Sequence, residues 1–69
     1  MPYNYSKLRG KIVEKYSTQS QFAQAIGMSE HSLSKKISGK IPFKQTEISK
    51  ACDLLDIASY EIASYFFTL

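Results

Sequence analysis

Residues 19–37 read QSQFAQAIGMSEHSLSKKI, and they decide the fold of this chain of 69 residues. Apolar residues recur four positions apart on each side of Gly27: Phe22 and Ile26 before it, and Leu33 and Ile37 after it. This spacing places each pair on one face of a helix. Glycine readily adopts the left-handed conformation that ends many helices, so Gly27 marks a turn between the two segments. The stretch therefore predicts two short helices joined tightly.

The residues that flank these segments predict where each helix starts and stops. Thr18 and Gln21 have the spacing of a capping box, so we expect the first helix to begin directly after Thr18. Ser29 is a good cap for the second helix, which we expect over about residues 29–38. Gly39 follows that segment and predicts its end.

Three further segments of the chain show helical spacing. One covers about residues 5–16. The clearest is a stripe formed by Ile48, Ala51, Cys52 and Leu55. Ser59 is placed to cap a short fifth helix, and we expect Ile41 and Phe43, in the segment before the stripe, to point inward. Five short helices without a strand predict one all-α domain over residues 1–69.

Composition and charge narrow the class of protein. Hydrophobic residues make up 43% of the chain, enough for a folded core. The N-terminal segment lacks the apolar region of a signal peptide and no run reaches transmembrane length, so we expect a cytoplasmic protein without a membrane partner. Residues 1–45 carry eight bases and two acids, a net charge of +6, whereas residues 46–69 carry one base and four acids, a net charge of −3. This asymmetry favours a surface that binds a polyanion.

The small, glycine and apolar positions of residues 19–37 resemble the helix-turn-helix motif of phage Cro and repressor proteins, the XRE-type family. The segment SLSKKISGK resembles the end of the recognition helix in that family, and the resemblance covers about residues 5–66. It implies a compact, five-helix, lambda-repressor-like DNA-binding domain. One position departs from the motif, because an apolar residue usually stands three after Leu33, where this chain has Lys36. We expect this departure to rotate which polar residues face outward.

The resemblance implies that the second helix of the motif enters the major groove of a double-stranded DNA operator. The residues that it implies for base contact are Glu30, His31, Ser34 and Lys35. Lysine donates to guanine, glutamate accepts from cytosine, and serine does either. The residues that it implies for phosphate contact are Gln19, Ser29, Ser32, Lys36, Lys40 and Lys44.

Simpler roles exist for several of these residues. Glu30 lies in the first turn of its helix, where a carboxylate interacts favourably with the helix dipole, and Ser29 is a helix cap in either case. Lysines such as Lys35 are common on solvated surfaces. One histidine and one distant cysteine do not make a metal site, and Cys52 lies on a core stripe that predicts a buried thiol. The sequence has no paired carboxylates, phosphate-binding glycine loop or nucleophile–base set, so we expect no catalysis, no cofactor and no small-molecule substrate.

Two functions fit the sequence. The first is a Cro- or repressor-type transcriptional regulator of a temperate phage or prophage switch in the bacterial host cell, acting as a homodimer on two half-sites. The second is a protein-binding modulator of repression, or antirepressor, a class of small phage proteins similar to this chain in size and layout. Such a protein docks on a partner repressor, alone or together on DNA, and Glu30 would pair with a basic recognition helix. The C-terminal residues that offer an oligomer contact are Tyr60, Tyr65, Phe66, Phe67 and Leu69, and a place in the core is the simpler role for most of them.

Overall fold

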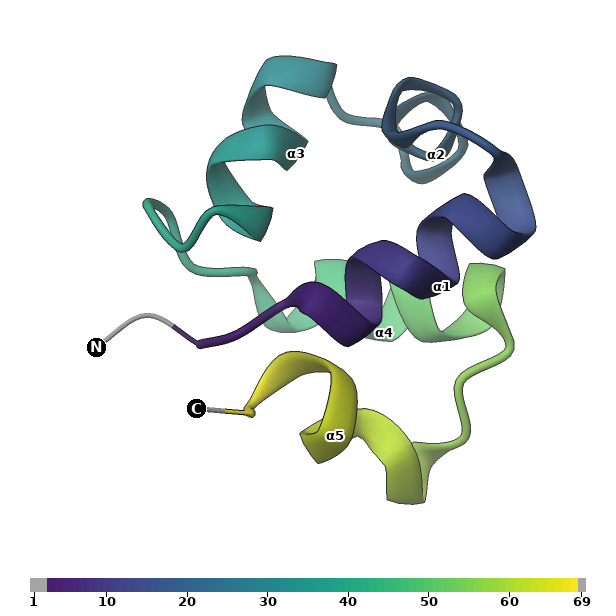
Figure 1. Cartoon of the computed structure of the whole chain (residues 1–69), viewed down its shortest axis with the longest axis vertical. Helices are drawn as coiled ribbons and strands as arrows, with labels where there is room; N and C mark the ends of the chain where they lie inside the picture. Colours follow the sequence, from purple (N-terminus) through teal and green to yellow (C-terminus); the bar gives the residue numbers. More distant parts are fainter. Residues whose placement is uncertain (1–2, 69) are drawn as a thin grey trace.

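The computed structural model describes residues 3–68, which form helices without any strand. The elements are α1 (Ser6–Tyr16), α2 (Gln19–Ile26), α3 (Glu30–Ile37), α4 (Gln45–Leu55), the 3₁₀ turn η1 (Ser59–Glu61) and α5 (Ile62–Phe66). Figure 1 shows α2 and α3 on one side of α1, with α5 on the other side. The prediction of an all-α chain with five helices is confirmed.

One hydrophobic core joins all five helices. Its largest fully buried side chains are Leu8, Ile12, Phe22, Leu33, Leu55 and Phe66. Every helix contributes at least one of them, so no helix can leave without exposing apolar surface. Burial of a side chain of this size stabilises a fold by about 1.5–3 kcal/mol. The core therefore fixes where the polar faces of the helices point.

The turn between α2 and α3 has the geometry that the sequence predicts. The Thr18 hydroxyl accepts a hydrogen bond from the Gln21 amide at 3.1 Å, which caps the start of α2. Gly27 ends α2 with a φ of +84°, a conformation that other residues rarely adopt. The amides of Gly27 and Met28 both donate to the Ala23 carbonyl at 3.0 Å, so this carbonyl is satisfied where the helix ends.

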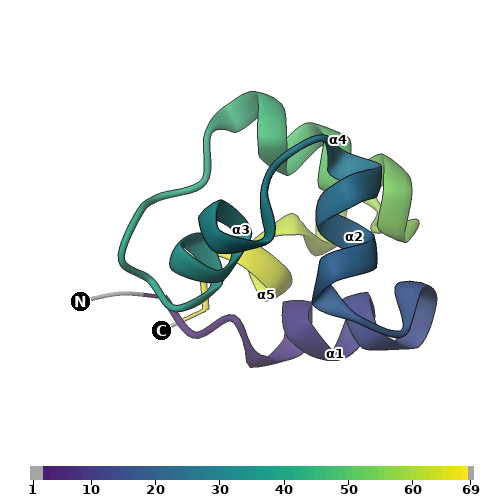
Figure 2. The ribbon, with the colours of Figure 1, turned by 90° about the horizontal axis from the view of Figure 1, so that it is seen from above.

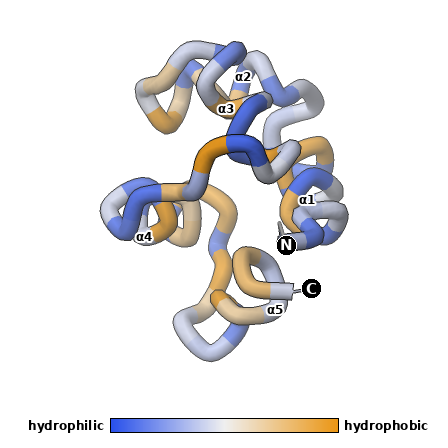
Figure 3. Tube along the Cα trace, turned by 90° about the vertical axis from the view of Figure 1, so that its left-hand side faces the viewer, coloured by the Kyte–Doolittle hydropathy of each residue, from blue (hydrophilic) through white to orange (hydrophobic). Residues whose placement is uncertain are grey.

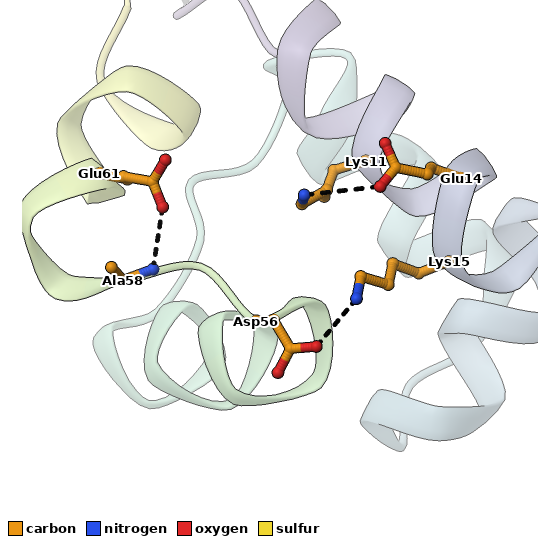
Figure 4. Close-up of polar contacts among 6 residues, drawn as sticks. All are labelled: Lys11, Glu14, Lys15, Asp56, Ala58 and Glu61. Carbon is orange, nitrogen blue, oxygen red and sulfur yellow. Dashed lines mark hydrogen bonds and ion pairs between the residues drawn. The ribbon is translucent and has the colours of Figure 1, made fainter.

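Polar contacts fix the C-terminal end of α4 and the turn that follows it (Figure 4). The Lys15 ammonium of α1 lies 2.8 Å from the carboxylate of Asp56, the residue that ends α4 in a left-handed conformation. The hydrogen bond from Lys15 lowers the pKa of Asp56 below its ordinary value. The prediction that Ser59 caps the last helix is wrong, because Ser59 lies inside η1 and the cap position of α5 is Glu61. The Ala58 amide, at the start of η1, donates to the Glu61 carboxylate at 3.2 Å.

The segment between α3 and α4 differs from the prediction at one of its two apolar residues. Phe43 is half-buried and packs against the core, as expected. Ile41 is 39% exposed, so the prediction that it points inward is wrong. The fixed φ of the intervening Pro42 prevents a regular helix through this segment. The side chains on either side of the proline therefore lie in different environments, one exposed and one against the core.

A stability prediction arises at Gly10, which lies exposed in α1. A Cβ atom built on Gly10 would meet no atom within 4 Å. We expect Gly10→Ala to raise the free energy of unfolding by about 0.5–1 kcal/mol, because alanine loses less backbone entropy on folding. Urea denaturation of the two proteins measures the difference. A less stable variant would show that another molecule or segment approaches α1 closely at this point.

Candidate partner-binding surface

The polar side of α3 forms the candidate surface. We define the α3 outer face as the four residues expected to contact bases: Glu30, His31, Ser34 and Lys35. The first three are exposed and Lys35 is half-buried. At about 100° per residue they lie within about 140° of the helix circumference, so they share one side. Buried Leu33 and Ile37 lie at about 300° and 340° on the same scale, counted from Glu30, and hold the adjoining side against the core. The α3 outer face can therefore contact another molecule without unfolding the helix.

Two of the residues predicted to contact phosphate form the start of α3. The Ser29 hydroxyl oxygen accepts a hydrogen bond from the Ser32 amide at 3.1 Å, and the two hydroxyl groups lie 3.0 Å apart. This cap satisfies one free amide at the helix start. Glu30 in the first turn and Lys35 in the last turn have the charges that the helix dipole favours. Helix formation alone thus explains part of the sequence of α3.

Lys36 is not on the surface, which corrects its expected phosphate contact. The residue is only 7% exposed, and its ammonium lies 2.5 Å from the Glu47 carboxylate. The same carboxylate oxygen accepts a hydrogen bond from the Lys44 amide at 2.8 Å, at the start of α4. Burial alone would raise the pKa of Glu47, but the hydrogen bonds from Lys36 and from the Lys44 amide lower it below its ordinary value.

The position three after Leu33 is therefore buried, although it holds a lysine. A lysine occupies it because its charge is matched by a carboxylate from α4. Lys36 and Ile37 are both buried, so the expectation that the departure rotates the outward face of α3 is wrong. The ion pair joins the last turn of α3 to the first turn of α4, and it limits movement of α3 relative to the rest of the fold.

The other residues predicted to contact phosphate differ in how accessible they are. Gln19 is half-buried at the first position of α2. Lys40 and Lys44 are exposed in the segment that follows α3. Among residues 3–68, neither of these lysines nor Lys35 has an ion-pair partner. Their charges are therefore available to an anionic group beside the α3 outer face.

The C-terminal residues predicted to form an oligomer contact divide into two groups. Tyr65 is 7% exposed and Phe66 is 1% exposed, so both have the simpler of their two expected roles, a place in the core, and the oligomer contact is wrong for them. The Lys7 ammonium also covers the Tyr65 ring, 4.7 Å from its centre. Tyr60 and Phe67 are exposed, and Leu69 lies outside the described residues. Tyr60 and Phe67 therefore remain as predicted contacts, and the structure does not test the prediction for Leu69.

The side chains between residues 3 and 68 form no constellation of metal ligands, because no group of three or more His, Cys, Asp or Glu lies together. No helix in this range is long and apolar enough to cross a membrane. Cys52 is buried, as its stripe predicts, and burial raises the pKa of its thiol.

Two features near this surface are absent from the sequence prediction. The contact between Lys36 and Glu47 joins residues on two different helices, so the periodicity of either helix does not predict it. The spacing of Lys44 and Glu47 does fit a glutamate that caps its own helix start, and this signal predicts half of the arrangement. The second feature is Tyr3, which precedes α1 and contacts Phe67 at the other end of the chain.

Comparisons with known proteins identify relatives of the whole chain. A family described as "protein of unknown function (DUF739)" matches residues 1–69. The solved structure of the modulator of repression (MOR) of the temperate bacteriophage TP901-1 from Lactococcus lactis is 46% identical in sequence and superposes with a TM-score of 0.84. The alignment covers 97% of this chain and 90% of that chain. No curated protein matches.

Proposed function

Because this chain belongs to the DUF739 family and is 46% identical to a phage modulator of repression, we propose that it is a phage modulator of repression that docks on a repressor. The likeness over 97% of the chain is the observation that carries this proposal. It supports a repression-related phage regulator, and it favours the protein-binding alternative over a Cro-type repressor. We infer that the protein acts by binding alone, without catalysis.

The charges of the α3 outer face suit a protein partner. Exposed Glu30 would meet repulsion from phosphates if α3 lay in a DNA groove. A basic side chain of a repressor would instead pair with Glu30, and an acidic side chain would pair with Lys35. Both charges lie at the surface, so such pairs would determine orientation and association rate more than affinity.

Direct DNA reading is the second candidate, and one observation favours it. Lys35, Lys40 and Lys44 are without ion-pair partners in the described chain, which leaves an excess of positive charge beside the α3 outer face. In this proposal α3 is the recognition helix of a helix-turn-helix, and its outer face contacts bases as the sequence resemblance implies. The two proposals are compatible if a mixed complex with the repressor sits on the operator.

A gel shift on the switch region of the phage separates the two candidates. We expect the protein alone to leave the DNA unshifted at physiological salt, and to change the shift that the repressor produces. A salt-sensitive, sequence-selective shift by the protein alone would instead support direct DNA reading.

Charge reversal on α3 tests which surface is used. We expect Lys35→Glu to weaken repressor binding about tenfold. The variant replaces an attraction by a repulsion, and a total change of about 1.4 kcal/mol in binding free energy corresponds to this factor. Arg9→Glu is the matched control, because Arg9 is an exposed residue of α1 and the change in charge is the same. Equal effects of the two variants would mean that only the net charge matters and that the α3 outer face is not the contact.

A further inference from the structure

An apolar groove lies where three distant parts of the chain meet. The segment before α1, the segment between α3 and α4, and the segment after α5 come together at the left of Figure 1. The groove has a volume of about 220 Å³. The side chains that matter for its walls are Tyr3, Ile41, Phe43, Ile48 and Phe67. Tyr3, Ile41 and Phe67 are 40%, 39% and 47% exposed, so the walls present unusually accessible apolar surface.

The walls of the groove are anchored in the core. The Tyr3 and Phe67 rings meet edge to face, with centres 5.4 Å apart. Phe43 contacts the buried Tyr5 and Phe66 rings, each with centres 5.3 Å apart. Edge-to-face pairs of this kind add stability beyond the area that they bury. The groove is therefore preformed, and an occupant would not have to order its walls on binding.

The charges beside the groove select the chemistry of its occupant. Lys40 directly precedes the wall residue Ile41, and Lys44 directly follows the wall residue Phe43. Figure 3 shows this alternation of hydrophilic and hydrophobic residues between α3 and α4. No acidic residue lines the groove, and among residues 3–68 neither lysine has an ion-pair partner. An apolar side chain flanked by carboxylates would satisfy both features.

We propose that this groove is a second contact for the repressor, and that it takes an aromatic or aliphatic side chain from an acid-flanked repressor segment. The inference rests on the proposed function, and it adds a contact separate from the α3 outer face. A buried anchor of this kind carries a large share of the affinity in protein interfaces. The acid-flanked segment would lie outside the DNA-binding surface of the repressor, because that surface is basic.

Two other occupants fit less well. A second copy related by a two-fold axis would bring the same patch against itself, so Lys40 and Lys44 of both copies would crowd one interface. DNA offers phosphates to the lysines but no apolar group that fills a groove lined by Ile41 and Phe67. The acid-flanked protein segment is the occupant that matches both the walls and the charges.

Calorimetric titration with the purified repressor of the same phage tests the walls. We expect Ile41→Ser and Phe67→Ser each to weaken repressor binding by about tenfold or more. Val13→Ser is the matched control, because Val13 is 53% exposed and lies outside the groove. We expect this control to bind like the wild type, and thermal unfolding of each variant verifies that it is folded.

The lysines provide an independent test that leaves the walls intact. We expect Lys40→Glu combined with Lys44→Glu to weaken repressor binding about tenfold at low salt, with a smaller effect at high salt.

If the wild type does not bind the repressor, the proposed function fails. If the wild type binds and the groove variants bind equally well, the groove inference fails while the proposed function stands. Groove variants that change only self-association in sedimentation would also overturn it, in favour of a second copy.

Discussion

Replacing Phe66 with alanine is expected to lower the free energy of unfolding by about 3–5 kcal/mol. The Phe66 ring is 1% exposed and packs edge to face on Phe43, with centres 5.3 Å apart. Its removal leaves a cavity where α5 meets the core, and the surrounding side chains close such a space only in part. A domain of this size has a total stability of about 3.5–10 kcal/mol, so the variant would be partly unfolded at 37 °C.

Phe67→Ala is the control for this prediction. It removes the same group one residue later, where the ring is 47% exposed, so we expect a loss of less than about 2 kcal/mol. Urea denaturation of both variants gives the comparison. Equal losses would contradict the core position of Phe66. A stable Phe66→Ala protein with impaired self-association would restore the sequence prediction of an oligomer contact.

Lys36→Met is expected to destabilise the protein by about 3 kcal/mol, because it leaves the Glu47 carboxylate without its ionic partner. This loss of stability is at the low end of the range for buried ion pairs, because the Glu47 side chain is 20% exposed and water can hydrate its carboxylate. Methionine fills the space of the lysine stem, so lost packing contributes little. Urea denaturation at neutral pH measures the effect.

The double variant Lys36→Met with Glu47→Gln separates charge from packing. Glutamine still accepts the Lys44 amide hydrogen bond but carries no charge, so we expect the double variant to recover most of the lost stability. A double variant as unstable as the single variant would show that the ion pair itself stabilises the fold.

The pH dependence of stability gives a second readout for the same ion pair. The folded-state pKa of Glu47 is lowered, so its contribution is present above the pKa of the unfolded chain and is lost as the pH falls through the folded pKa. We expect wild-type stability to fall more steeply below about pH 4 than that of the double variant. Both proteins keep Lys15 and Asp56, so this second pair cancels in the comparison. Parallel stability curves would contradict the lowered pKa.

Local sequence signals were sufficient for the helices and for the turn that presents α3. The Thr18 and Ser29 caps and the left-handed Gly27 depend on residues within three or four positions, so the sequence alone specifies them. The stripe around Cys52 likewise predicts the buried side of α4. The same local rules placed Glu30 and Ser34 on an exposed helix face.

The errors arose where a residue's environment depends on a distant partner. Lys36 is buried only because Glu47, from another helix, neutralises it, and a charge normally predicts exposure. Phe66 and Phe67 are chemically alike, yet α5 has only five residues, too few for a periodic pattern to separate the buried ring from the exposed one. The groove is assembled from Tyr3, Ile41 and Phe67, which three-dimensional packing alone brings together.

The most direct test is to add unlabelled phage repressor to isotope-labelled protein, without DNA, and to follow each backbone amide by NMR. The proposed function predicts saturable changes at the four residues of the α3 outer face, and the further inference adds changes at Ile41 and Phe67. The opposite result would contradict the account: no change on adding repressor, with the same α3 residues responding to operator DNA alone.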